Sequence, residues 1–363
     1  MKITVASAGD IPLSIWENWS ELQQADPRFD SPYFGPEFTR AVAAVRHNVE
    51  VAVLWRGNER VGFLPFQRQR HDIGVPVGEG LSDFHGVIAR DDVSWEAEEL
   101  VRACRLAAWE FDHLPTWQEP FRAYHLRSMI SPYIDLRGSL FSAEPDEPGQ
   151  VRKGPRGFHD VNKKRRKFGR EVGPLRFEPE VRNFDDCFET LIRWKRAQYE
   201  QTQVPDALAA AWKVELLARI CRQRSDTFGG LLSALYVGDR PVAIHLGMHS
   251  QTVMHAWFPA YDPALARYSP GLLLFCELCK MAAVGGYQRL DLGKGTQRFK
   301  LSLMSGAFEV AEGATDFRFV VRTARRAWYA LRAWIRGTRL REPARAGLGL
   351  MHAVQRRLAR KSE

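Results

Sequence analysis

Two stretches half a chain apart follow the same plan, and this internal repetition constrains the fold more than any other feature of the sequence. Residues 54–64 and 235–245 each run from an apolar segment through a glycine and a polar residue into a second apolar segment that opens with valine. Gly57-Asn58 and Gly238-Asp239 are residue types that a tight β-hairpin turn requires. Two hairpins can resemble each other by chance, but the matching order of the flanking elements favours two related halves.

The length and composition agree with two folded domains. The 363 residues exceed the roughly 250–300 at which a single core stops growing. A hydrophobic fraction of 45% and a charged fraction of 26% are those of a globular protein. Residues 141–156 are rich in Pro, Gly and acids, which indicates a linker. We therefore expect domains at 1–150 and 151–321, followed by a tail at 322–363.

Helices and strands interleave in both halves, which predicts an α/β fold with mixed, mainly antiparallel sheets flanked by helices. In the first half, apolar periodicity predicts helices at 13–24, 36–45 and 95–109 and strands at 124–129 and 133–136, besides the hairpin. In the second half we expect helices at 183–201, 206–222, 269–283 and 297–304, and strands at 230–237, 242–248, 253–257, 289–292 and 315–321.

The net charge of +9 lies in the tail. Residues 322–361 hold twelve basic residues and one acid, so the rest of the chain is slightly acidic, which argues against a surface shaped throughout for nucleic acid. Between residues 324 and 335 the apolar side chains fall on one helical face and most arginines fall elsewhere. These apolar residues are Ala327, Trp328, Leu331, Trp334 and Ile335. The pattern is typical of a basic amphipathic helix on an anionic membrane surface, or of a helix docked on its own protein, and residues 351–358 repeat it weakly.

Apolar stretches, the first ten residues and the cysteines indicate where the protein is located and whether it binds a metal. No stretch is long and apolar enough to span a membrane, and the first ten residues do not resemble a secretory signal, so we expect a cytoplasmic protein that is peripheral, if anything, at the inner face of the membrane. Five cysteines do not suggest a disulfide framework. Cys276 and Cys279 lie within an apolar run, where packed thiols are expected rather than a metal, so no metal cofactor is predicted.

Ser269, Pro270 and Gly271 mark the start of a predicted helix. Ser suits the N-cap, Pro suits the first turn, and Gly lets a ligand approach the backbone. The first amides of a helix lack internal partners and lie at the positive end of its dipole, so such a turn can bind a diphosphate. An ordinary N-cap explains the same residues.

The order of motifs around this turn indicates a particular protein family. The sequence has the hairpin at 235–247, Ala260-Tyr-Asp-Pro, Tyr268-Ser-Pro-Gly-Leu, Gly286, Leu290-Asp-Leu-Gly-Lys-Gly and Phe299-Lys300. In the first half it has Ser31-Pro-Tyr-Phe, Glu37-Phe38 and Leu81-Ser-Asp-Phe, and a basic helix at 163–170 and Trp194 follow. Over about residues 31–314, this order resembles the CelD-type acyltransferases of exopolysaccharide and cellulose biosynthesis. These are GNAT proteins distantly related to the Fem-type peptidyltransferases.

The resemblance implies tandem GNAT-like domains, the first of them degenerate, and an acyl-CoA co-substrate, with acetyl-CoA the foremost candidate. In GNAT folds two central strands separate, one free edge pairs with pantetheine, and the next helix start binds the diphosphate. Mapped onto this chain, that edge is the strand 253–257, with Val253 and His255, and the diphosphate turn is Arg267, Ser269, Pro270 and Gly271. The usual GNAT loop has Gln or Arg and then two separated Gly, whereas this chain offers only Arg267 and Gly271. That departure leaves an aminoacyl-tRNA donor, as in Fem-type proteins, open.

Acyl transfer needs a base for the acceptor and a donor for the leaving thiolate. His245, expected at a strand end facing the cleft, is the first candidate base, and a structural histidine in the sheet is its alternative. Asp291 is a candidate for positioning the acceptor or for capping its loop. Tyr268 is a candidate proton donor for the thiolate or a packing residue under the turn.

Further residues are expected to bind the acceptor. Asp83 and His85, two residues apart on a predicted strand, would face the same side at the junction of the domains, or else stabilise a loop. Lys300 would hold a phosphate or carboxylate, and Arg165 of the basic helix would reach an anionic group, unless both are simply solvated. Trp194 is included through the resemblance.

Three functions therefore remain. The first is an acyltransferase that moves an acyl group from acyl-CoA to an amine or hydroxyl of a cell-envelope or exopolysaccharide precursor, such as a lipid-linked glycan. The second is a Fem-like transferase that depends on aminoacyl-tRNA. The third is a non-catalytic double-GNAT scaffold at the membrane surface. DNA is not expected as a partner, because the sequence lacks helix-turn-helix signals and aromatic platforms.

Overall fold

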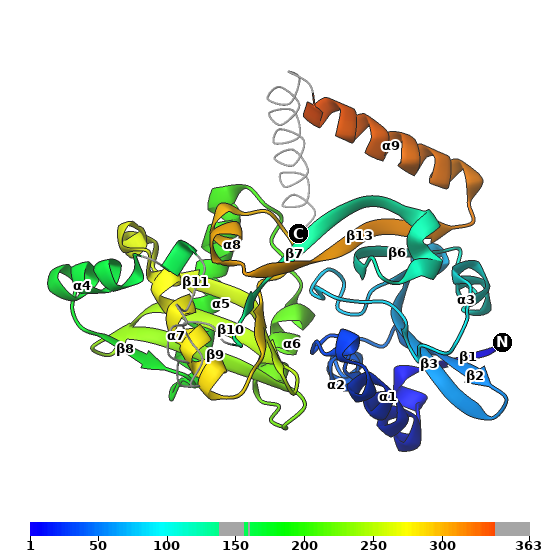
Figure 1. Cartoon of the computed structure of the whole chain (residues 1–363), viewed down its shortest axis with the longest axis horizontal. Coiled ribbons are helices and arrows are strands. Elements are labelled where there is room, and N and C mark those ends of the chain that lie inside the picture. The colour runs from blue at the N-terminus through cyan, green and yellow to red at the C-terminus, as the bar shows by residue number, and fades with distance from the viewer. Residues whose placement is uncertain (138–155, 159, 338–363) are drawn as a thin grey trace, which may run out of the picture.

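A computed structural model describes residues 1–137, 156–158 and 160–337 (Figure 1). The predicted linker and the second amphipathic piece of the tail lie almost entirely or entirely outside these residues. Thirteen strands form one mixed sheet in the order β1-β2-β3-β4-β6-β13-β7-β12-β11-β10-β9-β8, with β5 beside β3. The strands are β1 (Lys2–Ser7), β2 (Val49–Arg56), β3 (Glu59–Gln69), β4 (Ile73–Val75), β5 (Ile88–Ala89), β6 (Ala108–Pro115), β7 (His125–Asp135), β8 (Leu175–Glu178), β9 (Gly229–Val237), β10 (Arg240–His249), β11 (Val253–Tyr261), β12 (Arg289–Asp291) and β13 (Gly306–Asp316).

Helices cover the sheet, which confirms the predicted α/β class. The helices are α1 (Leu13–Ala25), α2 (Pro36–Ala43), α3 (Ala97–Ala103), α4 (Val161–Glu171), α5 (Phe184–Thr202), α6 (Ala211–Cys221), α7 (Pro270–Val284), α8 (Arg298–Leu303) and α9 (Phe319–Gly337). Residues of α5 and α6 share one core with α1 and α2, whereas residues of α4 and α7 form a second core. In the part of the chain that the structure covers, no helix is both long and apolar enough to cross a bilayer.

The two halves repeat one arrangement. Both predicted hairpins are confirmed: β2 pairs with β3 around Gly57, and β9 pairs with β10 around Gly238, and both glycines have a positive φ. Each half then contains a parallel pair joined through a helix, β4 with β6 through α3 and β11 with β12 through α7. All other pairings of the described strands are antiparallel.

The halves also exchange a strand. β7, from the first half, pairs with β12 of the second, and β13, from the second half, pairs with β6 of the first. β7 and β13 pair with each other along most of their length at the centre of the sheet (Figure 1). The predicted segments 1–150 and 151–321 are therefore interlocked within one continuous sheet.

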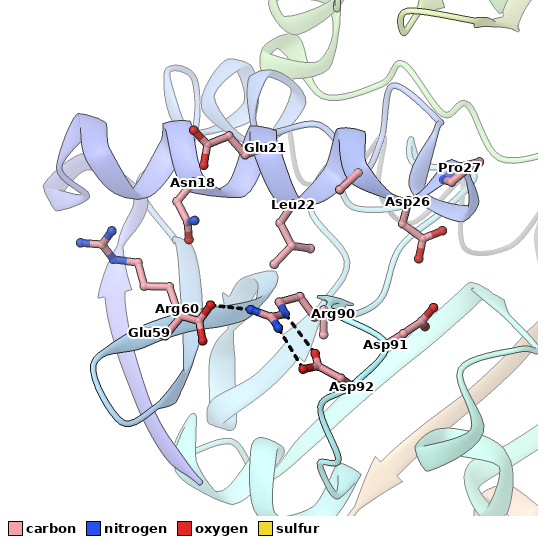
Figure 2. A pocket seen from close by; sticks show the side chains of 12 residues that line it. Asn18, Glu21, Leu22, Asp26, Pro27, Glu59, Arg60, Arg90, Asp91 and Asp92 are labelled. Atoms are coloured by element: carbon pink, nitrogen blue, oxygen red, sulfur yellow. Dashed lines mark hydrogen bonds and ion pairs between the residues drawn. The ribbon is translucent and has the colours of Figure 1, made fainter.

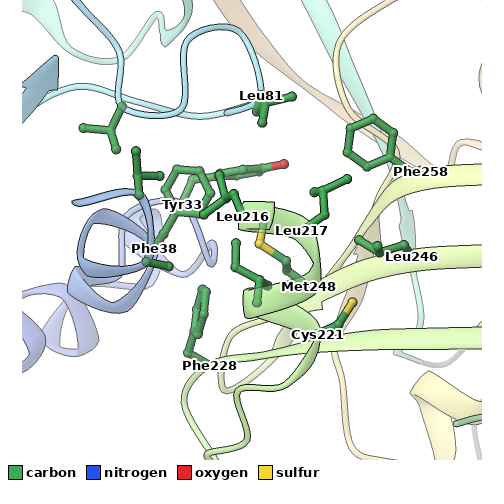
Figure 3. Packing of buried hydrophobic residues seen from close by; sticks show 14 of the residues in the cluster. Tyr33, Phe38, Leu81, Leu216, Leu217, Cys221, Phe228, Leu246, Met248 and Phe258 are labelled. Carbon is green, nitrogen blue, oxygen red and sulfur yellow. The ribbon is translucent and has the colours of Figure 1, made fainter. Parts of the chain in front are cut away.

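A hydrophobic core joins the halves on one face of the sheet. Figure 3 shows Tyr33 and Phe38 of the first half beside Leu216 of α6 and Met248 of β10, and all four are buried. At roughly 25 cal/mol per Å² of buried apolar surface, such a continuous core strongly opposes separation of the halves. It also fixes the residues from 31 to 38 against β11.

One predicted element was wrong in a way that matters for the site. The helix predicted at 95–109 ends at Ala103, and the chain enters strand β6 at Ala108. The apolar spacing of this segment suits both structures, and tertiary pairing with β13 and β4 decides for the strand. β6 contributes Asp112 and His113 to the polar cluster described below.

Candidate active site

Strand β11 opens away from β12 halfway along its length. Val253, Met254 and His255 pair with Arg289, Leu290 and Asp291 of β12, and no pairing with β12 follows. On the other side of β11, the register with β10 places both Ala256 and Trp257 opposite Gly247, which is a β-bulge. A Cβ at Gly247 would lie 2.6 Å from the carbonyl oxygen of His255, so only glycine permits this close approach. The bulge bends β11 and leaves residues 256–261 with a free edge toward β12.

The predicted edge for pantetheine therefore moves by a few residues. Val253 and His255 were expected to pair with the ligand, but β12 already pairs with this stretch. The backbone that β12 leaves unpaired lies beyond them, from Ala256 to Ala260, and within it the Pro259 carbonyl accepts a hydrogen bond from Lys195.

The start of α7 lies beyond the end of this edge. A 3-10 helix, Pro263–Tyr268, leads to Ser269, whose φ of 57° is left-handed, and α7 begins at Pro270. Ser269 occupies the predicted N-cap position of α7, but its side chain makes no capping hydrogen bond to the helix. Its hydroxyl instead accepts a hydrogen bond of 3.1 Å from the Lys164 ammonium of α4. The first turn of α7 thus lies next to a cation.

The basic helix α4 supplies this positive charge. The Lys167 ammonium lies 5.7 Å from the centre of the Tyr268 ring, close to the same turn. Arg165, predicted to reach a substrate, forms an ion pair of 2.5 Å with Glu277 of α7 instead and holds the two helices together. Lys164 and Lys167, together with the amides of the turn, form a surface that favours phosphate groups.

Tyr268 and Arg267 stabilise the turn from below. The Tyr268 hydroxyl accepts a hydrogen bond of 2.6 Å from Arg267 and donates one of 3.0 Å to Glu171. The ring is buried against Phe168 of α4. Since the hydroxyl is already engaged, these contacts favour the packing alternative for Tyr268 over the predicted proton donor.

A polar cluster, buried at its histidines and partly exposed at its carboxylates, lies at the point where β11 and β12 separate. Asp83 comes from the loop between β4 and β5, not from a strand as predicted, and its carboxylate lies 3.0 Å from Nε2 of His255 and 2.9 Å from Nε2 of His113. The Trp257 indole donates a hydrogen bond of 2.8 Å to the carbonyl of Leu81 and so fixes this loop on β11. Residues of both halves thus meet at one carboxylate.

The backbone after β12 is shaped to admit Asp83. Gly293 has a φ of 74°, and a Cβ at this position would lie 2.3 Å from Oδ2 of Asp83. No side chain fits there. The glycine of the Leu290-Asp-Leu-Gly motif is therefore required for contact between the carboxylate and the second half.

His113 is held as an imidazolium. Its Nδ1 lies 3.1 Å from Asp112 and its Nε2 lies 2.9 Å from Asp83, and carboxylates only accept protons, so both ring nitrogens carry one. Burial opposes the charge, but Asp83 and Asp112 outweigh it and raise the pKa of His113 to about 9. Although burial also opposes ionisation of Asp83, His113 and His255 hold its pKa well below the usual value.

His255 and Tyr33 complete the cluster. His255 is fully buried, and its Nε2 lies 3.0 Å from a carboxylate oxygen of Asp83, which favours the tautomer with the proton on Nε2 and the lone pair on Nδ1. The rings of Tyr33 and His255 are 4.9 Å apart in an edge-to-face contact. Burial, and then the charges of Asp83 and Asp291, raise the pKa of Tyr33 well above 10, so its hydroxyl stays protonated.

Two lysines border the cluster. Lys300 donates hydrogen bonds of 3.0 Å to the carbonyls of Gly293 and Lys294, and burial lowers its pKa. Lys195 donates to the carbonyl of Pro259 on β11, and burial, with a smaller effect from Lys300, lowers its pKa to about 8. Both ammonium groups therefore lie beside the cluster and are partly shielded from water.

Asp291 and Trp194 lie nearby in different roles. One carboxylate oxygen of Asp291 is 2.9 Å from Nε of Arg289, and the residue is buried at the end of β12. Trp194 packs on the hydrophobic core, whereas its neighbour Lys195 reaches the strand.

His245 and His85 do not occupy the predicted positions. His245 lies within β10, not at its end; it is fully buried, and burial lowers its pKa to about 3. Nε2 of His85 accepts hydrogen bonds from the backbone amides of Asp112 and His113, at 3.2 and 3.0 Å, so this ring anchors the Asp83 loop to β6.

His85, Asp112 and His113 lie close enough together to suggest a metal site. The lone pair of His85 Nε2 is already shared between two amides, however, and His113 is protonated on both nitrogens. A metal ligand must offer a free lone pair, so these residues do not fit a metal ion.

Two of the cavities in the described structure border the first half. One, of about 630 Å³, lies between α1 and the segment 89–92; Figure 2 shows that Arg90 is paired there with Glu59 and Asp92. Five acidic and two basic side chains line it, and it does not include the cluster. The other, of about 530 Å³, is lined by Asp112 together with Glu79 and with Arg325 and Tyr329 of α9. It therefore borders Asp112, which contacts His113, and His113 in turn contacts Asp83.

A sheet that opens after a bulge, followed by a helix start with neighbouring cations, is the arrangement expected of a GNAT-type acyltransferase domain. A sequence model of the family described as acetyltransferase (GNAT) domain matches residues 156–301, and GNAT domains generally use acyl-CoA. No curated protein matches the chain significantly.

Solved structures agree on the fold. The C-terminal domain of a putative lysylphosphatidylglycerol synthetase from Agrobacterium fabrum is 12% identical, with 89% of this chain and 96% of that chain covered and a TM-score of 0.55. FemX is 9% identical, with 86% and 96% covered and a TM-score of 0.53. L-PGS from Bacillus licheniformis is 11% identical, with 86% and 96% covered and a TM-score of 0.50. At these identities the likeness shows the fold alone.

Proposed function

We propose that this protein transfers an acyl group from acyl-CoA to an amine or hydroxyl group of a cell-envelope or exopolysaccharide precursor, at the point where β11 separates from β12. The observation that carries this proposal is the buried contact of Asp83 with His255. It places an oriented imidazole where the free edge of β11 begins.

The donor binds along this edge. The unpaired backbone on either side of Pro259, which itself has no N–H to donate, pairs with the pantetheine amides. The diphosphate binds at the first turn of α7, where a Cβ at Gly271 would meet only the ring of the exposed Tyr261. Lys164 and Lys167 add charge, which favours a diphosphate over a neutral ligand. Acetyl-CoA is the simplest donor of this kind.

His255 is the base in this proposal, in place of His245. Asp83 keeps the proton of His255 on Nε2, so Nδ1 accepts the proton that the acceptor loses as it attacks the thioester. The imidazolium that forms is stabilised by the Asp83 carboxylate. Before the reaction, the positive charge of His113 partly compensates the negative charge of this carboxylate. Lys300 and the Tyr33 hydroxyl are the nearby donors for developing negative charge.

The acceptor class rests on sequence and fold resemblance. The motifs at 31–34, 81–84 and 290–295 resemble those of CelD-type proteins, and the structure brings Tyr33, Asp83 and Gly293 together. Two similar folds carry names that denote synthesis of a modified phospholipid. An acceptor borne by a lipid or a glycan at the inner face of the membrane agrees with both.

The rival donor is an aminoacyl-tRNA, since FemX has a similar fold. One experiment distinguishes between these two donors. We expect acetyl-CoA to raise the melting temperature of the purified protein in proportion to ln[ligand], with no such rise from an aminoacyl-tRNA at saturating concentration. Stabilisation by aminoacyl-tRNA alone would replace the acyl-CoA assignment, and stabilisation by neither would favour the non-catalytic scaffold.

A further inference from the structure

Helix α9 attaches to the rest of the protein through one side. Arg325 pairs with Glu110 of β6, the Tyr329 hydroxyl lies 3.4 Å from Glu312 of β13, and Arg326 donates a hydrogen bond to the carbonyl of Ala123. In Figure 1 the helix lies beyond β13 and β7, away from the other helices. Polar contacts, rather than an apolar face, hold it in place.

The apolar side of α9 faces away from the protein. Trp334 follows Arg325 by nine residues, about two and a half helical turns, and so lies on the opposite side. Val320, Leu331 and Trp334 are 77%, 46% and 60% exposed. Ala324 and Ala327 continue this stripe at spacings of three and four residues. The helix thus does not bury its apolar stripe in its own protein, which was the alternative open from the sequence.

The charges of α9 indicate what covers this stripe. The helix has no acidic residue, and Arg332 lies beside Trp328 at the margin of the stripe, whereas Arg322, Arg325 and Arg326 lie on the side toward the protein. Two copies that met through the stripe would bring like charges together, whereas an anionic lipid surface would neutralise them. Exposed Trp328 and Trp334 are residues that favour the interface between lipid head groups and acyl chains.

We propose that α9 docks the protein on an anionic phospholipid bilayer, with the stripe of Val320, Leu331 and Trp334 inserted between head groups. Arg325 and Tyr329, on the opposite side, line the 530 Å³ cavity that Asp112 also lines. The docked helix therefore holds this cavity about one helix diameter, ~10 Å, from the bilayer. On the proposed acyltransferase function, the cavity is where a lipid-borne acceptor enters.

Co-sedimentation of the full chain with vesicles tests the docking. Wild-type protein is mixed with vesicles of equal phosphatidylglycerol and phosphatidylcholine, or of phosphatidylcholine alone. The stripe variant carries Leu331→Ser and Trp334→Ser, and the control carries Leu13→Ser and Val204→Ser, which are also exposed apolar residues. We expect at least tenfold stronger binding to the anionic vesicles, a loss of at least tenfold in the stripe variant, and no loss in the control.

The outcomes separate docking from the other readings. Equal binding of the stripe variant and wild type would overturn the proposal, because the basic residues alone would then suffice. A wild-type dimer that the variant converts to a monomer in sedimentation velocity, without vesicle binding, would assign the stripe to a second copy. Melting temperature with and without acetyl-CoA, measured on the same variant, tests the donor site separately, since none of these substitutions touches it.

Discussion

Replacement of His113 by Gln should remove a defined pH dependence of stability. In the folded protein Asp83 and Asp112 outweigh burial and raise the pKa of His113 from 6.5 to about 9, which corresponds to roughly 3 kcal/mol. Because the folded pKa lies above the unfolded one, this contribution is complete below pH 6.5 and disappears as the pH rises through 9. Between pH 7 and 9.5 the wild type should therefore lose about 2 kcal/mol through this group alone.

Urea denaturation followed by tryptophan fluorescence at pH 7, 8, 9 and 9.5 measures this effect. The difference between wild type and His113→Gln should shrink by about 2 kcal/mol over that range. His47→Gln, at an exposed histidine, is the matched control and should parallel the wild type at every pH. A difference between wild type and His113→Gln that stays constant from pH 7 to 9.5 would mean that His113 is not an imidazolium, and the electrostatic description of the cluster would be wrong.

Three further substitutions test the site. Asp83→Asn should lower kcat with acetyl-CoA at least ~100-fold, since His255 loses its carboxylate, while the Kd for acetyl-CoA from calorimetry changes less than about twofold; an unchanged kcat would remove Asp83 from the mechanism. Gly271→Phe should raise KM for acetyl-CoA at least ~10-fold, because the ring covers the turn, whereas Gly169→Phe, where a Cβ meets nothing within 4 Å, should not; equal KM values would place the diphosphate elsewhere. Gly247→Val should destabilise the fold by about 1–3 kcal/mol in urea denaturation, because its Cβ would lie 2.5 Å from the His245 ring; an unaffected midpoint would mean that the bulge is easily deformed.

Local chemistry explains what the sequence could predict. Gly57 and Gly238 in hairpin turns, the helix start at Pro270, and the amphipathic pattern from Ala324 to Trp334 depend on residues close together in the chain. These were confirmed as elements of the fold.

The polar cluster depends on long-range contacts, and the sequence shows only part of it. The sequence indicated Asp83 as an acceptor-binding residue and His255 as part of the pantetheine edge. The structure instead places the two side chains in contact with each other. Asp112 and His113 were missed because the helix predicted at 95–109 covered the first residues of β6, and no element was predicted for residues 110–123. The alternation from Ala108 to Leu114, with buried residues at most positions, was the available signal, but it is too irregular to decide alone.

The exchange of β7 and β13 could not be read from the sequence either. Each strand is an ordinary apolar segment. Its own sequence does not indicate which strand of the other half it pairs with. That exchange is what brings the Asp83 loop of one half to β11 of the other. Residues about 170 positions apart, Asp83 and His255, therefore share one contact of 3.0 Å.

A crystal structure of the complex with acetyl-CoA tests the central claim most directly. We expect the diphosphate at Ser269 to Gly271, pantetheine beside the backbone of Ala256 to Ala260, and the thioester at His255 and Asp83. Acetyl-CoA bound elsewhere on the protein, with residues 256–260 untouched, would contradict this claim.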